Sequence, residues 1–271
     1  MSTIAYRNSL LSGLRTALLT ATVVEAAANF AMLRLRLGAK PLTARDRANW
    51  LQDAACTLLK RIGMEVVAEG DPPLQGLVVS NHLSYLDVLA YASIAPCVFV
   101  AKREVRAWPV FGAFATMAGT IYVDRERRTA NSGASALIEE ALAAGVPVVL
   151  FPEGTSTDGV PVLRFHSRFF EPAVRGNAVV TAAAIGYASS TAEETALAYY
   201  GEDVFGSHLV RTLGQRHLEA RVAFAASGQR YADRKEAARA TQAEVELLRS
   251  GFARYSAVKQ RTDPLRLGRV G

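Results

Sequence analysis

The sequence predicts an α/β fold in which a mixed sheet is flanked by helices. Two short apolar runs, residues 76–80 and 145–151, have the length and β-branched content of buried strands, and each ends in a polar turn. Helical and strand-like segments alternate along the rest of the chain, without an internal repeat or a low-complexity stretch. Such alternation favours one sheet whose strand-end motifs converge on one side. At 271 residues, one α/β domain with additions is expected.

The other elements follow from periodicity and turn residues. The expected helices span residues 42–62, 130–144 and 230–249, and Thr43 is the expected cap of the first of them. The expected strands span residues 97–101, 120–123, 178–185 and 219–225. The segment 178–185 is expected as an inner strand and 219–225 as an edge strand.

Residues 1–65 are expected to form a helical arm that associates with a membrane, ahead of a second unit at 66–271. The net charge of +6 lies entirely in this arm, because residues 1–61 hold nine Lys and Arg against three acids and the remainder is neutral. The arm's longest uncharged run, residues 16–24, is well short of the ~20 residues needed to span a bilayer. A basic flank beside an apolar helix is typical of a helix lying on an anionic membrane surface. The alternative is a helix packed on the protein's own core.

Other partners and locations fit the sequence less well. The basic arm shows no interleaved aromatic residues and no nucleic-acid-binding motif, which argues against a nucleic-acid partner. Arg15 and Glu25 shorten the apolar stretch to the bottom of the range for a secretory signal. Cys56 and Cys97 form no disulfide pattern and have no metal-ligand neighbours. We therefore expect a peripheral or monotopic protein on the cytoplasmic face of the cell membrane, with no bound metal.

The first chemical motif follows the strand-like run 76–80 and reads Asn81-His82-Leu83-Ser84-Tyr85-Leu86-Asp87. If Ser84 caps a helix over residues 85–95, Asp87 lies in its first turn and reaches back to the imidazole of His82. A carboxylate on one ring nitrogen fixes the tautomer and leaves the other nitrogen as a proton acceptor. The spacing therefore predicts a general-base dyad, although taken alone it also fits a solvated turn.

The second motif ends the run 145–151 and reads Pro152-Glu153-Gly154-Thr155-Ser156-Thr157-Asp158-Gly159. Its hydroxyls and backbone amides suit an anionic group. An ordinary turn is built from the same residue types, but a carboxylate at the end of a buried strand needs partners, which points to a role for Glu153.

Together the two motifs resemble the glycerophospholipid acyltransferase family, whose members include 1-acyl-sn-glycerol-3-phosphate acyltransferases. The family carries an Asn-His-x4-Asp block and a Phe-Pro-Glu-Gly block at about this separation, joined by a basic segment. Here that segment contains Lys102, Arg103 and the run Gly119 to Arg125. The resemblance covers about residues 76–190 and implies a glycerol-3-phosphate acyltransferase-like fold, with an acyltransferase domain at 66–271.

The resemblance also implies roles for individual residues. A fatty acyl group would pass from a thioester of coenzyme A or acyl carrier protein to the free sn-2 hydroxyl of lysophosphatidic acid, without a bound cofactor. His82 would act as the general base and Asp87 would orient it. Asn81, or backbone amides near it, would hold the developing oxyanion. Glu153, Gly154 and Thr155 would bind the acceptor headgroup.

The departures from the family pattern concern the acceptor. Many members have arginine after Glu-Gly-Thr, where this chain has Ser156. Lys102, Arg103 and Arg125 then become the candidates for binding a phosphate. His166, in place of a family lysine block, is either a solvated loop residue or a substitute cation, while His208 and His217 are expected on the surface. Two alternatives stay open: a different acceptor, such as lyso-ornithine lipid, and a non-catalytic lipid-binding module.

Overall fold

The computed structural model of the chain describes residues 8–124 and 131–262. Its strands are β1 (Met64–Glu69), β2 (Leu77–Ser80), β3 (Val98–Lys102), β4 (Ile121–Val123), β5 (Val148–Leu150), β6 (Val180–Ser189) and β7 (Leu218–Phe224). Its α-helices are α1 (Ser9–Leu37), α2 (Ala44–Ile62), α3 (Leu86–Ile94), α4 (Phe111–Met117), α5 (Asn131–Ala143), α6 (Glu171–Arg175), α7 (Glu194–Leu197), α8 (Phe205–Leu213) and α9 (Arg234–Thr262). The short 3-10 helices η1 (Arg103–Ala107) and η3 (Ser167–Phe170) complete the described elements.

Within the described ranges the strands form one mixed sheet in the order β1-β7-β6-β2-β5-β3-β4. From β6 to β4 every neighbouring pair is parallel. β7 runs antiparallel to β6, and β1 pairs in parallel with β7 at the edge of the sheet. The predicted mixed α/β sheet is therefore confirmed, and both sequence motifs follow strands of its parallel part.

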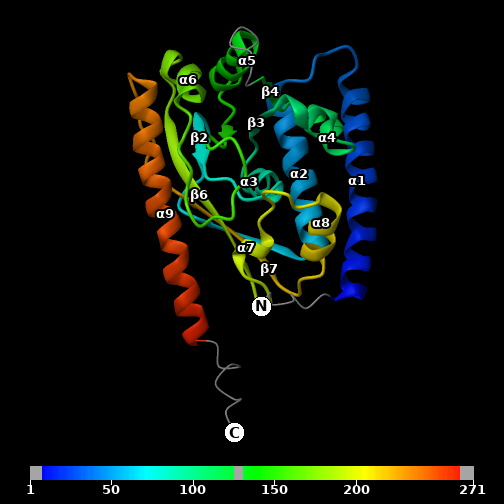
Figure 1. The fold of residues 1–271 in the computed structure, drawn as a ribbon. Coiled ribbons are helices and arrows are strands. Elements are labelled where there is room, and N and C mark those ends of the chain that lie inside the picture. Colours follow the sequence, from blue (N-terminus) through cyan, green and yellow to red (C-terminus); the bar gives the residue numbers. More distant parts are fainter. Residues whose placement is uncertain (1–7, 125–130, 263–271) are drawn as a thin grey trace.

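Helices cover both faces of this sheet, as Figure 1 shows, with α9 on one side and α1, α2 and α3 on the other. Alternate residues of the central strand β2 supply the two cores, because successive side chains of a strand point to opposite faces. Val78 belongs to the core beneath α2 and α3, whereas Leu77 and Val79 belong to the core beneath α5 and α9. A strand buried on both faces gives the continuous apolar run seen in the sequence.

The sheet differs from the expectation at one edge. The segment expected as an edge strand, β7, lies inside the sheet and is buried along its whole length. Its two charged residues, Glu219 and Arg221, bond each other inside the protein, so their charge is not a sign of solvent exposure. The true edge strand is β1, which the sequence did not predict because Glu65 and Glu69 interrupt its apolar pattern. The expected division between residues 65 and 66 falls inside this strand.

Most helices begin close to where the sequence placed them. In α2, Thr43 accepts a hydrogen bond from the backbone N–H of Asp46 and the Asp46 carboxylate accepts one in return, which confirms the expected cap. The helix ends at Gly63, whose φ of 68° is the left-handed conformation that glycine accepts without strain. α9 extends to Thr262, well beyond the expected residue 249.

The N-terminal helix α1 packs along α2 and α8 through one stripe of its surface (Figure 1). The stripe contains Ser12, Arg15, Thr22 and Ala26, which are buried at helical spacing. The Trp50 indole N–H of α2 donates to the Ala26 carbonyl at 3.0 Å. The Arg15 guanidinium donates to the carbonyls of Leu213 and Gln215. One face of α1 is therefore part of the protein's own packing.

The opposite side of α1 is apolar and exposed. Leu10 and Leu35 are 86% and 81% exposed, and Leu14 and Val24 are also exposed. Among the described residues, α1 is long and apolar enough to cross a membrane, judged by length and composition alone. Some basic residues of the arm make contacts within the protein: Arg61 pairs with Glu25 at 2.6 Å, and Arg47 donates to two carbonyls of α4. Arg36 and Lys40 are exposed to solvent.

Candidate active site

The parallel strands bring the sequence motifs together at the carboxyl ends of the central strands. β2 lies directly beside β5, with Val79 opposite Leu150. His82 follows the carboxyl end of β2, Glu153 follows that of β5, and Lys102 ends β3. Because the carboxyl ends of parallel strands meet at the same edge, three segments that are distant in sequence surround one place. The expected convergence of the two motifs is confirmed.

The dyad has the geometry that the spacing predicts. The Nδ1 atom of His82 lies 2.7 Å from the Oδ2 atom of Asp87, at the start of α3. The same oxygen accepts the backbone N–H groups of Leu83 at 2.7 Å and Ser84 at 3.1 Å. Asp87 is fully buried, and a buried carboxylate needs such donors. Nδ1 therefore carries a proton toward Asp87, and Nε2 is left to accept one.

The helix start itself differs in detail from the expectation. α3 begins at Leu86, so its N-cap residue is Tyr85 and the expected cap at Ser84 is wrong; the Ser84 hydroxyl lies 3.4 Å from the Leu86 backbone nitrogen. Asp87 supplies the stronger contact to the free amides of the preceding turn. The carboxylate thus serves the helix N-terminus and the imidazole together.

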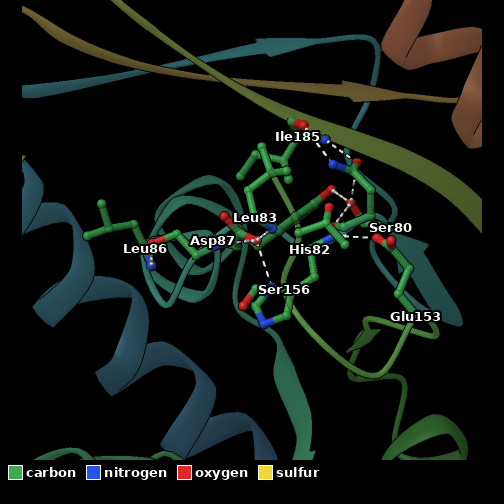
Figure 2. Close-up of polar contacts among 12 residues, drawn as sticks. Ser80, His82, Leu83, Leu86, Asp87, Glu153, Ser156 and Ile185 are labelled. Carbon is green, nitrogen blue, oxygen red and sulfur yellow. Dashed lines mark hydrogen bonds and ion pairs between the residues drawn. The ribbon is translucent and has the colours of Figure 1, made fainter. Parts of the chain in front are cut away.

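His82 makes three further contacts that hold it in place. Its backbone N–H donates to the Oε1 atom of Glu153 at 2.8 Å, and its carbonyl accepts the Thr157 N–H at 2.9 Å. The imidazole stacks on the Phe151 ring, with 4.2 Å between ring centroids and 14° between planes. In Figure 2, Asp87 and Glu153 lie on the two sides of His82. The histidine side chain stays 23% exposed, so a substrate can reach it.

Glu153 joins the second motif to the first. Its Oε2 atom accepts the Leu163 backbone N–H at 2.8 Å, while Oε1 accepts that of His82. Burial raises the pKa of Glu153 to about 7, and these two backbone N–H groups oppose that rise by favouring the charged form. The expected partners of this carboxylate are therefore backbone amides. In the same turn Thr155 is exposed and Ser156 is half-buried, and their expected contact with a headgroup stays a prediction.

The turn after Glu153 depends on one glycine. Gly154 has a φ of 78°, in the left-handed region that favours glycine, and its N–H donates to the Phe151 carbonyl at 3.1 Å. This conformation sends the chain back toward His82, where Thr157 bonds it. The Gly154 position in the motif is thus explained by the close approach of the two segments.

Asn81 has a different role from the one expected. Its side-chain N–H donates to the Ile185 carbonyl at 2.9 Å, and its side-chain oxygen accepts the Ile185 N–H at 2.9 Å. Its exposed fraction is 2%. The Asn81 side chain therefore ties the end of β2 to β6, and the other expected oxyanion donors, the backbone amides near it, stay a prediction.

The expected phosphate-binding cations are only partly placed. Lys102 ends β3 and is half-buried, and Arg103 follows it with a side chain that is 68% exposed. Arg103 lies 3.4 Å from the Asp124 carboxylate, just after β4. Both residues are at the same sheet edge as the dyad. Arg125 lies outside the described residues, so its role stays a prediction.

Two residues near the dyad were missed or misplaced by the sequence analysis. The Tyr187 hydroxyl, on β6, donates to the Oδ1 atom of Asp87 from 100 positions away, and no spacing rule connects them. His208 was expected on the surface, yet it is fully buried. Its Nδ1 atom lies 3.0 Å from the Tyr85 hydroxyl. Its amphipathic helix α8 packs this histidine inward. By contrast, His217 is exposed, as expected for a surface residue, and His166 is exposed too, which fits both alternatives for it.

This fold and site define a class of enzyme: an α/β protein that carries an imidazole base, oriented by a buried carboxylate, at the carboxyl edge of its sheet. The comparisons with known proteins agree with that class. Residues 63–186 match the family model described as Acyltransferase. The lyso-ornithine lipid O-acyltransferase of Pseudomonas aeruginosa is 34% identical over 232 residues, which are 82% of this chain and 86% of that protein.

Other relatives carry a second substrate name. The 1-acyl-sn-glycerol-3-phosphate acyltransferase of Neisseria meningitidis is 33% identical over 60% of this chain and 64% of its own length. The crystal structure of the 1-acyl-sn-glycerophosphate acyltransferase of Thermotoga maritima superposes with a TM-score of 0.66 over 92% of this chain and 95% of that one. At 18% identity this match shows the shared fold alone. The chain belongs to the glycerophospholipid acyltransferase family.

Proposed function

We propose that this protein transfers a fatty acyl group from a thioester to the free hydroxyl of a lysolipid. The observation that carries the proposal is the dyad, in which a buried carboxylate holds Nδ1 of His82 and leaves Nε2 as the proton acceptor of a side chain that is 23% exposed. General-base catalysis needs this orientation and a hydroxyl within hydrogen-bond distance of Nε2.

The reaction follows directly from the dyad. Nε2 of His82 takes the proton of the acceptor hydroxyl, and the hydroxyl oxygen attacks the carbonyl carbon of the thioester. The tetrahedral intermediate then breaks its carbon–sulfur bond, and the imidazolium returns the proton to the leaving thiolate. Asp87 stabilises the imidazolium formed between these steps. The products are an ester and a free thiol, so an acyl-enzyme is not required. The donor is acyl-coenzyme A or acyl carrier protein.

The first candidate acceptor is lysophosphatidic acid, whose acylation gives phosphatidic acid in phospholipid biosynthesis. Relatives named as 1-acyl-sn-glycerol-3-phosphate acyltransferases support this acceptor. Lys102 and Arg103 also support it, because they lie at the carboxyl end of β3, which pairs with the strand that leads to Glu153, and they offer charge-assisted contacts to a phosphate. Arg125 is the third cation of this set.

The second candidate acceptor is lyso-ornithine lipid, and two observations favour it. The Pseudomonas aeruginosa relative named for this lipid aligns with most of the chain. Ser156 stands where many family members have a phosphate-binding arginine, and it is half-buried in the turn beside His82. A headgroup without a phosphate does not need that arginine.

We further propose that the enzyme works on the cytoplasmic face of the membrane, with α1 as its contact with an anionic surface. The helix supports this by presenting exposed leucines on one side while its other side packs on α2 and α8. Exposed basic residues near its carboxyl end, such as Arg36 and Lys40, suit anionic headgroups. A lipid substrate then reaches the site from the surface to which the protein is bound.

The deciding experiment is a thiol-release assay of the purified protein with each acceptor and each donor, followed by mass spectrometry of the lipid product. We expect thiol release that depends on the acceptor and is lost in His82→Ala. Ester formation on lysophosphatidic acid and on lyso-ornithine lipid, compared by kcat/KM, ranks the two acceptors. Lipid binding without thiol release for any combination would instead identify a non-catalytic lipid-binding module.

A further inference from the structure

The Asp87 carboxylate receives a hydrogen bond that the sequence motif does not contain. Three donors converge on its Oδ2 atom: the imidazole of His82 and the backbone N–H groups of Leu83 and Ser84. The other oxygen, Oδ1, accepts the hydroxyl of Tyr187, which lies on β6 rather than in the loop or helix of the motif. Both oxygens of a fully buried carboxylate are thereby satisfied.

We propose that Tyr187 is a positioning residue for acyl transfer, whose hydroxyl fixes the orientation of Asp87 and limits how tightly the dyad holds its proton. The inference rests on the proposed acyl transfer, because it assigns a role within the same site. Tyr187 does not touch the reacting atoms, since Asp87 stands between it and His82.

Tyr187 is placed by a rigid part of the fold. It is 7% exposed, and its backbone N–H donates to the Glu194 carboxylate at 2.8 Å. Glu194 in turn pairs with Arg249 of α9, at 2.8 Å and 2.9 Å for its two oxygens. Two positions earlier on the same strand, Ile185 bonds both ends of the Asn81 side chain. β6 therefore holds the catalytic loop at two points, through Asn81 and through Asp87.

The phenol stays a hydrogen-bond donor over any practical assay range. Burial, followed by the negative charge of Asp87, raises the pKa of Tyr187 well above its usual 10. A neutral phenol that donates to a carboxylate draws off part of its negative charge and so weakens its hold on the imidazolium. The carboxylate keeps enough charge to orient the ring.

Other titratable groups also surround this network. Tyr85, the N-cap residue of α3, and Glu194 of α7 face Tyr187. Tyr91 of α3 faces Asp87, and Glu153 of the second motif faces His82. These groups are unchanged when only the Tyr187 hydroxyl is removed. A change in the titration of His82 in such a variant therefore reports the lost phenol.

The test compares Tyr187→Phe with Tyr91→Phe in the full chain. Tyr91 is a matched control, because it is 3% exposed in the same core and its hydroxyl donates to Ser80 at 2.7 Å instead of to Asp87. For Tyr187→Phe we expect kcat to fall about ten- to a hundredfold with KM little changed, since one hydrogen bond to a charged group is lost. We also expect the acidic limb of the pH–rate profile to move up by about one unit.

A second measurement does not depend on turnover. The chain has four histidines, so ¹⁵N-labelled imidazole signals can be assigned through His82→Gln and titrated by NMR. We expect the titration midpoint of His82 to rise by about one unit in Tyr187→Phe and to stay in place in Tyr91→Phe. Equal midpoints in wild type and Tyr187→Phe would overturn the proposal even if the protein acylates no lysolipid. If both variants lost kcat equally and the acidic limb of the pH–rate profile did not shift, Tyr187 would contribute only to packing of the core and the proposal would be wrong.

Discussion

Glu153 offers a prediction whose size can be worked out from the structure. Burial raises its pKa from the usual 4.5 to about 7, and each unit corresponds to about 1.4 kcal/mol. Because the folded protein holds this proton more tightly than the unfolded chain, the free energy of unfolding falls as pH rises from 4.5 to 7. The contribution is about 3 kcal/mol, which is a large part of a typical domain's stability.

The perturbation is Glu153→Gln, which keeps one side-chain oxygen to accept a backbone N–H and removes the titrating proton. Losing the second acceptor leaves the N–H of His82 or Leu163 without its partner and costs about 1–3 kcal/mol at every pH. On top of this constant, the stability of the variant relative to wild type should rise by about 3 kcal/mol between pH 4.5 and pH 7.

The assay is urea unfolding of both proteins at several pH values across that window. Glu236→Gln, which changes the same group on the exposed surface of α9, reports the effect of net charge alone. A stability difference between wild type and Glu153→Gln that stays level with pH would refute the reasoning. It would mean that Glu153 is charged in the folded protein and that the two backbone N–H groups outweigh its burial.

Three further predictions concern the dyad, the arm and the acceptor. His82→Ala should abolish transfer without unfolding the protein, and Asp87→Asn should lower kcat by about 10²–10⁴-fold, since each removes a correctly oriented base. The double change Leu10→Ser with Leu35→Ser should weaken sedimentation with anionic vesicles several-fold, because both side chains are exposed on α1. Arg125→Ala should raise the apparent KM for lysophosphatidic acid by about ten- to a hundredfold, with a smaller change for lyso-ornithine lipid.

Each of these predictions has an outcome that would contradict it. If either dyad variant kept more than about a tenth of the activity, the general-base assignment would be wrong. Leu247→Ser on α9 is the control for vesicle binding, since Leu247 is 71% exposed on the other side of the sheet. If the double variant sedimented with vesicles as well as wild type, the exposed leucines of α1 would not contribute to membrane binding. Equal losses on both acceptors would assign Arg125 to the donor or to the fold.

The sequence by itself determined the central strands and the chemistry at their ends. β2 and β5 are buried on both faces, so their apolar runs stand out, and each run stops at polar or turn-forming residues. The contact between His82 and Asp87 could be predicted because it is local, as five positions separate them across one helix start. The capping box of α2 could be predicted for the same reason.

Only the tertiary structure decided which polar groups are left for substrate. Asn81 stands beside the dyad in the sequence, yet its amide bonds Ile185, 104 positions away. Tyr187 reaches Asp87 across 100 positions, and β1 becomes a strand only because β7, far along the chain, pairs with it. Such partners depend on strand order and register. Strand order and register are set by how the whole chain packs, and a local pattern of residues does not determine them by itself.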